Sequence, residues 1–244
     1  DYEGILKNEG QIKELFLSKQ DTLGALMNGF LGEAYLYWEN DLNKSLGFYQ
    51  KEYELRSALG KEGGDIKNLI FNLGYIQDEL GFYGKTESLY LELLQLEEAA
   101  SGVKSEDYFI SATSLLDHYV FTEEFNKGLD LIKDLKKNVD RKSFEEAMLL
   151  KFTGDFYQMS GANRKSEKAL LESLEILKEN GLYASVEYVS VLNSMGGLYT
   201  IIGKIPVAEE VYQEALSIMD RLQGDYSDYE LALKGNLALI LQLL

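Results

Sequence analysis

One short pattern recurs along this chain at a nearly constant interval. In GGLYTIIGKIPVAEEVYQEALSI, residues 196–218, Gly196 is followed seven positions later by Gly203, and then by alanine, tyrosine, alanine and leucine in turn. The segments around Gly74 and Gly154 carry residues of similar kind at the same offsets. A fixed interval of this length is typical of helical-repeat arrays, in which each unit buries its apolar face against its neighbours.

The interval is 42 residues in four of its five steps and 38 residues in the remaining one. The shorter step separates Leu116 from Gly154, and Leu116 is the one large residue in the small-residue place. The copies around Gly32 and Leu116 match the pattern more loosely than the others. Five copies and the start of a sixth are therefore expected, with the small-residue place occupied in turn by Gly32, Gly74, Leu116, Gly154, Gly196 and Ala238.

Each copy is predicted to form two helices, because apolar residues recur three and four positions apart in both of its halves. The small residue in the first helix allows the second helix to approach closely. Glycine there costs about 1 kcal/mol of helix propensity relative to alanine, so close packing has to outweigh that cost. The second glycine, at Gly81, Gly161 and Gly203, suits the left-handed conformation that ends a helix. Pro206, the only proline, suits the first turn of the next helix.

Between residues 22 and 244, this pattern resembles the tetratricopeptide repeat. The unit of that family is an antiparallel helix pair with a small residue and a tyrosine in its first helix, a glycine in the turn, and alanine, an aromatic residue and alanine-leucine in its second. The usual unit has about 34 residues, so each helix is longer here by roughly one turn, as in the similar long units of the kinesin light chain. The resemblance implies an all-α fold, a right-handed α-α superhelix of antiparallel helix pairs. The family's proline at the end of the second helix is missing from every copy.

The repeat boundaries predict a single solenoid over residues 1–244. Residues 1–20 are expected to form an incomplete N-terminal unit or a cap, and residues 226–244 the first helix of a further, truncated unit. Between these segments we expect helix-pair repeats at 22–60, 64–100, 105–138, 142–180 and 184–222.

The C-terminal segment is expected to expose apolar surface, because no second helix follows to cover it and helical arrays need polar caps. We therefore expect either that the natural chain continues or that this end docks on another copy, which makes self-association possible. The residues expected to be uncovered are Leu237, Leu239, Ile240, Leu241, Leu243 and Leu244.

The net charge of −17 argues against several classes of partner. Nucleic-acid binding depends on clustered lysine and arginine residues that neutralise phosphates, and an acidic chain is disfavoured at anionic lipid surfaces. No apolar run reaches the roughly 20 residues that a membrane-spanning helix requires. We therefore expect neither a nucleic-acid partner nor membrane insertion. The absence of cysteine fits reducing and oxidising compartments alike, and we favour a cytoplasmic location.

The sequence contains no convincing catalytic, cofactor-binding or metal-binding set. The single histidine, His118, cannot form a two-histidine metal site, and no cysteine can assist it. We interpret His118 as a surface or half-buried imidazole. Gly84-Lys85-Thr86 matches the end of a phosphate-binding loop, but Glu79 stands where that motif needs its first glycine. The chain is therefore predicted not to be an enzyme, and no cofactor is expected.

The resemblance implies that the first helices line a concave groove, the usual binding surface of such arrays. Residues three before, one after and four after the small residue should then face inward. Four of these residues are acidic and only Lys151 is basic, so the groove is predicted to be acidic with aromatic patches. The candidate groove residues are Glu33, Tyr37, Phe71, Tyr75, Asp78, Thr113, Asp117, Phe121, Lys151, Asp155, Gln158, Asn193 and Thr200.

Two groups of aromatic residues are expected to differ in role. One group, three positions after the small residue, is predicted to pack between helices in the core: Tyr35, Tyr119, Tyr157 and Tyr199. The other group is less easily assigned to that stripe and either reaches the inner surface or is covered by its neighbours: Tyr37, Trp38, Phe71, Tyr75 and Phe121.

An acidic groove with aromatic patches is expected to attract a basic or aromatic-rich peptide. Chaperone-binding members of the resembling family hold a free carboxylate with inward lysine and asparagine residues, and Lys151 is nearly alone here, so a co-chaperone role is not expected. The leading hypothesis is a protein–protein interaction scaffold that forms part of a longer chain. The alternative is a sensor that binds a small peptide or metabolite and controls an attached effector domain.

Overall fold

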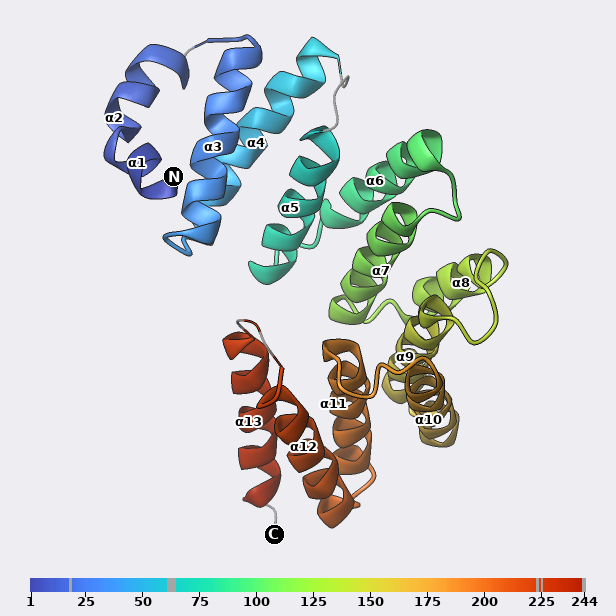
Figure 1. Cartoon of the computed structure of the whole chain (residues 1–244). Helices are drawn as coiled ribbons and strands as arrows, with labels where there is room; N and C mark the ends of the chain where they lie inside the picture. The colour runs from blue at the N-terminus through green and yellow to red at the C-terminus, as the bar shows by residue number, and fades with distance from the viewer. Residues whose placement is uncertain (18, 61–64, 223, 225, 243–244) are drawn as a thin grey trace. The chain divides into compact units, whose positions relative to one another are not determined.

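Helices are the only regular secondary structure in the computed structural model, which describes residues 1–17, 19–60, 65–222, 224 and 226–242. Thirteen α-helices and one short π-helix lie in those segments, without a β-strand (Figure 1). Neighbouring helices pack in pairs joined by short turns, which confirms the predicted all-α repeat fold. The contacts divide the chain into two compact units, unit 1 from Asp1 to Thr122 and unit 2 from Glu123 to Leu244.

Unit 1 contains the first seven α-helices (Figure 1). Within it α3 packs against α4, and α5 packs against both α6 and α7, while α1 contacts α3. The first helices α5 and α7 therefore lie side by side. The elements of this unit are α1 (Tyr2–Lys7), α2 (Glu9–Ile12), the π-helix η1 (Lys13–Leu17), α3 (Thr22–Tyr37), α4 (Leu42–Leu59), α5 (Asp65–Glu79), α6 (Thr86–Ser101) and α7 (Glu106–Phe121).

Unit 2 contains the last six α-helices (Figure 1). α9 packs against α8 and α10, α11 packs against α12, and α13 contacts both α11 and α12. The boundary between the units falls inside the range 105–138, in the copy with the shortened step. The helices are α8 (Phe125–Leu135), α9 (Phe144–Met159), α10 (Asn163–Glu179), α11 (Val186–Ile201), α12 (Ile205–Met219) and α13 (Ser227–Leu241).

In α3, α5, α9 and α11 the small residue is a glycine that faces a large side chain of the second helix. A Cβ atom added to Gly74 would lie 2.6 Å from the Tyr90 ring, and one added to Gly196 would lie 2.5 Å from the Tyr212 ring. Real Cβ contacts are essentially never shorter than 3.0 Å. The predicted close approach is therefore confirmed, and the energetic cost of a helical glycine is offset by ring packing.

The turn between the two helices of a pair has the predicted backbone conformation. Gly81, Gly161 and Gly203 have φ angles of 74°, 74° and 75°, in the left-handed region that glycine adopts most readily. In the copy around Leu116, Glu123 takes the place of this glycine and has a φ of 57°, although it carries a side chain. Pro206 lies in the first turn of α12, as expected.

A second periodic feature, which the sequence analysis missed, starts the first helices. Asp21, Ser105, Ser143 and Ser185 each stand eleven residues before the small-residue place and are the N-caps of α3, α7, α9 and α11. In each case the side-chain oxygen accepts a hydrogen bond from the backbone N–H three residues later, at 2.8–3.2 Å. Such caps satisfy amides that the helix itself leaves without acceptors.

Three of the four tyrosines predicted to belong to the core are buried. The Tyr35 hydroxyl donates to Glu9 at 2.8 Å and the Tyr119 hydroxyl donates to Glu87 at 2.9 Å. Burial and the Glu167 carboxylate raise the pKa of Tyr199. Burial and the bond to Glu9 raise the pKa of Tyr35 to about 12. Each of the two hydrogen bonds ties a first helix to a helix that precedes its own pair: α3 to α2, and α7 to α6.

The prediction was wrong for Tyr157, which is only half-buried. Leu129 stands at the place in its repeat that Glu87 and Glu167 occupy in theirs. A buried hydroxyl would have no acceptor there, and buried polar groups nearly always have one. The Tyr157 ring stays at the surface instead, with the Lys165 ammonium 5.2 Å from its centroid.

Candidate binding surface

The first helices of unit 1 expose one side along a regular stripe. Its members stand six before, two before, one after and five after the small residue, so they follow the 4, 3, 4 spacing of a helix face. All twelve are exposed or half-buried. We call this set the first-helix stripe: Leu26, Phe30, Glu33 and Tyr37 on α3; Asn68, Asn72, Tyr75 and Glu79 on α5; and Ile110, Ser114, Asp117 and Phe121 on α7.

Aromatic side chains are prominent on this surface. Tyr37 is 60% exposed, Phe121 55% and Tyr75 45%, and Phe71, one residue off the stripe, is 38% exposed. Trp38, at the end of α3, is 58% exposed. All five aromatics whose placement was left open therefore lie at the surface, and their use in binding stays a prediction.

Asp78 differs from the expectation that it faces an open groove. It is 7% exposed, and Leu36, at the same place in α3, is 8% exposed. One residue corresponds to about 100° around a helix, which turns this position toward the packed side. The neighbouring stripe position, occupied by Tyr37, Glu79 and Phe121, is the exposed one.

His118 was also assigned wrongly, because it is buried and not at the surface. Its exposed fraction is 3%, and its Nδ1 atom lies 2.8 Å from Asp78 Oδ1. The Tyr90 ring meets the imidazole edge-on, with 6.0 Å between the ring centroids. Burial together with the negative charge of Asp78 raises the pKa of Tyr90. The three side chains join α5, α6 and α7, so the imidazole serves packing.

The candidate residues of unit 2 are held in contacts within that unit. Lys151 and Asp155 form an ion pair of 3.1 Å with both side chains 14% exposed. Asn193 accepts a hydrogen bond from Asn236 at 3.0 Å, and Thr200 donates to the Gly196 carbonyl at 2.8 Å.

Gln158 and Thr113 complete the predicted set. Gln158 is half-buried, with its Oε1 atom buried and without a hydrogen-bond partner. The Thr113 hydroxyl donates to the Ile110 carbonyl at 2.8 Å, and Thr113 itself is half-buried. In unit 1, Glu33 is half-buried and Asp117 is exposed, and both acids belong to the first-helix stripe. Their predicted place in a binding groove stays a prediction.

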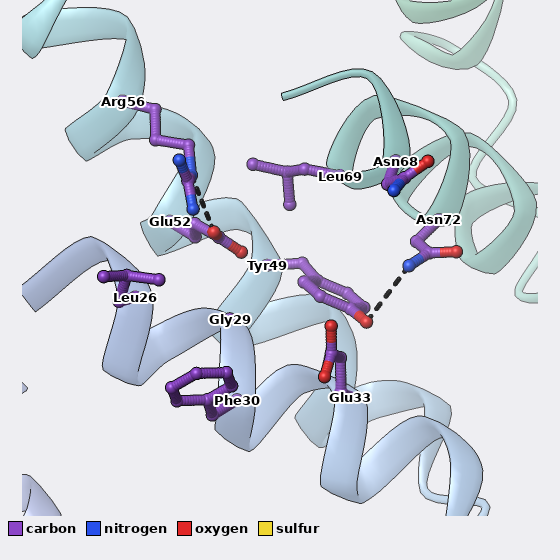
Figure 2. A pocket seen from close by; sticks show the side chains of 10 residues that line it. All are labelled: Leu26, Gly29, Phe30, Glu33, Tyr49, Glu52, Arg56, Asn68, Leu69 and Asn72. Carbon is purple, nitrogen blue, oxygen red and sulfur yellow. Dashed lines mark hydrogen bonds and ion pairs between the residues drawn. The ribbon is translucent and has the colours of Figure 1, made fainter. Parts of the chain in front are cut away.

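Unit 1 contains a pocket of about 170 Å³ between α3 and α5, with α4 beneath it (Figure 2). Five stripe residues line it. Figure 2 shows side chains from all three helices around the same hollow. The complete lining is Leu26, Gly29, Phe30, Glu33, Tyr49, Glu52, Arg56, Asn68, Leu69 and Asn72.

The floor of this pocket is polar and closely fitted. Glu52 is 5% exposed and accepts a hydrogen bond from Arg56 Nε at 2.7 Å. The Asn72 amide donates to the Tyr49 hydroxyl at 3.1 Å. A Cβ atom on Gly29 would lie 2.7 Å from Glu52 Oε2, so the carboxylate occupies space that only glycine leaves open.

Sequence reasoning missed most of the pocket and found only Glu33. Phe30 on α3 and Asn68 and Asn72 on α5 stand at stripe positions, as Glu33 does. The 4, 3, 4 spacing along each first helix was therefore the signal that could have identified them. Arg56 and Glu52 come from a second helix, and no spacing within the first helix points to them.

The described residues offer no alternative site of a metal-dependent kind. No group of three or more histidine, aspartate or glutamate side chains among them is arranged to hold a metal ion. None of the helices in the same residues is both long and apolar enough to cross a membrane.

No protein-family model and no curated protein matches the sequence. Solved structures do match. A kinesin-light-chain-like protein from Podosopora anserina with nearly identical TPR-like repeats has a TM-score of 0.64 at 10% identity, over 73% of this chain and 86% of that one. The TPR protein TTC0263 from Thermus thermophilus has a TM-score of 0.58 at 16% identity, over 89% of this chain and 99% of that one. This chain has the tetratricopeptide-repeat (TPR) fold.

A further match is the apo form of the quorum sensor NprR from B. thuringiensis. It has a TM-score of 0.68 at 13% identity, and the match covers 100% of this chain and 65% of that one. At such low identities these likenesses establish the TPR fold alone.

Proposed function

We propose that this TPR chain is a protein-interaction scaffold that binds a partner peptide or protein on the first-helix stripe of unit 1. The observation that carries this proposal is the exposure of aromatic side chains next to acids on one helix face. Exposed apolar patches with a polar surround are typical of interaction sites, and large aromatic residues dominate binding energies.

The charge of the stripe selects the kind of partner. Three of its twelve residues are acidic and none is basic, on a chain with a net charge of −17. Complementary charge speeds association and discriminates against wrong partners. A basic segment that also carries aromatic or aliphatic residues therefore fits this surface, and binding should weaken as salt concentration rises.

The test is a peptide selected from a random displayed library on the immobilised chain, with its affinity measured by fluorescence anisotropy. Tyr75→Ala and Phe121→Ala should each weaken binding about tenfold, or roughly 1.4 kcal/mol. Tyr183→Ala is the matched control, because Tyr183 is 56% exposed but lies in the turn between α10 and α11. Loss of affinity in the control, with none in the two stripe variants, would overturn the proposal.

A sensor role is the second candidate, and the match of the whole chain to a quorum sensor favours it. In that role the chain binds a small peptide or metabolite and controls an attached effector domain. The proposal is tested by hydrogen exchange with a selected short peptide. Slower exchange that extends beyond the contacted helices supports a sensor, whereas protection confined to the contact supports a scaffold.

Self-association through α13 is proposed as an additional property. Leu231, Leu239 and Leu241 are 69%, 58% and 49% exposed, although Leu237 is half-buried and Ile240 is buried, contrary to expectation. Leu243 and Leu244 lie outside the described residues. Light scattering should show a dimer that Leu239→Glu disrupts; a monomer at all concentrations would contradict it.

A further inference from the structure

The pocket of Figure 2 is too small for a whole ligand. Its volume of about 170 Å³ compares with roughly 300–1,000 Å³ for pockets that hold small molecules. A cavity of this size accommodates the end of one side chain. Since half of its lining belongs to the stripe, an extended partner lying on that stripe would pass over it.

The lining of the pocket is electrically negative. It carries two carboxylates, from Glu33 and Glu52, and one guanidinium, from Arg56. Arg56 is held by Glu52 at 2.7 Å, and its side chain is only 15% exposed. An anion entering the pocket would have to share this guanidinium with a carboxylate already bound to it. Burial raises the pKa of the Tyr49 hydroxyl, and the charges of Glu33 and Glu52 act in the same direction.

The remaining lining suits a cation on a flexible stem. Phe30 is 41% exposed and presents an aromatic ring at the pocket wall (Figure 2), and ring faces attract ammonium and guanidinium groups. Asn68 and Asn72 each bring an amide oxygen, which accepts hydrogen bonds from such groups. Leu26 and Leu69 supply apolar contact for methylene groups.

We infer that this pocket binds the cationic end of one lysine or arginine side chain of the partner, between Phe30, Glu33 and the amides of Asn68 and Asn72. The inference rests on the proposed function and adds the residue class that the partner must carry. It also favours a peptide over a whole metabolite at this position.

The experiment uses the whole chain and four small probes that each contain a chain of four carbon atoms. n-Butylammonium and n-butylguanidinium carry the proposed charge, n-butanol is neutral, and butyrate is anionic. Binding is followed by NMR shifts of the Gly29 backbone amide and the Asn68 and Asn72 side-chain amides. The two cations should shift these signals at physiological salt, and the other two probes should not.

Glu33→Gln should weaken cation binding about fivefold, which corresponds to roughly 1 kcal/mol. Asp117→Asn is the matched control, because it removes one negative charge from the same stripe outside the pocket. Equal losses in the two variants, shifts with butyrate, or no shift at these amides with either cation would overturn the inference. The comparison of the four probes on the unmodified chain decides the matter even if Glu33→Gln folds poorly.

Peptides selected for binding separate this inference from the proposed function. If binding depends on Tyr75 but survives glutamine at every lysine and arginine of the peptide, the stripe binds partners and the pocket assignment fails. If no peptide binds while butylguanidinium still shifts the pocket amides, the pocket assignment stands and the proposed function fails.

Discussion

Gly74 is a residue whose lack of a side chain shapes its surroundings. Gly74→Ala should lower the free energy of unfolding by about 1–3 kcal/mol, even though alanine favours helices by about 1 kcal/mol. The reason is the Tyr90 ring, 2.6 Å from the position of the new Cβ atom. Urea unfolding followed by circular dichroism measures the change.

Gly47→Ala is the control for that substitution. Gly47 lies inside α4, and an added Cβ atom would have nothing within 4 Å. Alanine there should raise the free energy of unfolding by about 0.5–1 kcal/mol. Stabilisation by both substitutions would mean that the helices of this pair are not closely packed at Gly74.

Asp78→Ala should destabilise the chain because it leaves the buried His118 imidazole without its carboxylate partner. The expected loss is about 1–3 kcal/mol in the free energy of unfolding, measured by urea unfolding. Asp78→Asn keeps a hydrogen-bonding group and should cost less. Asp117→Ala, on the exposed stripe, should change stability by about 0.5 kcal/mol or less; an equal loss in all three variants would contradict the assigned role.

The roles of residues that depend only on local backbone geometry could be predicted from the sequence. Gly81 and Pro206 were identified correctly because a turn or a first helical turn requires them whatever surrounds it. It did not predict the burial of His118, because the partner carboxylate is 40 positions away in the sequence. A helical position also shifts by about 100° with each residue, so an error of one residue placed Asp78 on the wrong side.

At the scale of helices, the N-caps set where the first helix of each repeat begins. Ser185→Ala should lower the free energy of unfolding by about 1 kcal/mol, because the Tyr188 amide loses its acceptor. Ser185→Asp restores an acceptor and should leave stability nearly unchanged. Urea unfolding and hydrogen exchange at the start of α11 measure both, and equal losses would refute capping as the cause.

Helix pairs were predictable because each carries its own apolar periodicity. The pocket was not predictable, because its lining comes from three helices. The ion pair of Glu52 with Arg56 lies on α4, whereas Glu33 lies on α3. The boundary between the two units was not predicted either. It falls in the copy around Leu116, where the large residue and the shortened step were interpreted as a loosely matching repeat.

For the molecule as a whole, buried tyrosines predict loss of stability in alkali. The pKa of Tyr35 is raised to about 12, and burial also raises the pKa values of Tyr49, Tyr90, Tyr199 and Tyr212. Tyrosine in unfolded chains ionises near 10. The unfolded state therefore loses protons first, and the free energy of unfolding should fall as the pH rises from about 10 to 12.

Ultraviolet absorbance of tyrosinate checks this expectation. Tyr35, Tyr49, Tyr90, Tyr199 and Tyr212 should ionise in the native chain only at a higher pH than tyrosine in unfolded chains. In denaturant all of them should titrate together. A single transition near the ordinary value in the native chain would contradict the tyrosine burial described above.

The hydrogen bonds from Tyr35 and Tyr119 to glutamates of earlier helices act as separate mechanical restraints along the array. A chain stretched from its two ends would release them one at a time, each as a discrete mechanical event. At the junction of α8 with α9, Leu129 stands at the place of the glutamate, so it offers no side-chain acceptor for the Tyr157 hydroxyl. Under tension, the α8–α9 junction should therefore separate at a lower force than the α6–α7 junction, which keeps this bond.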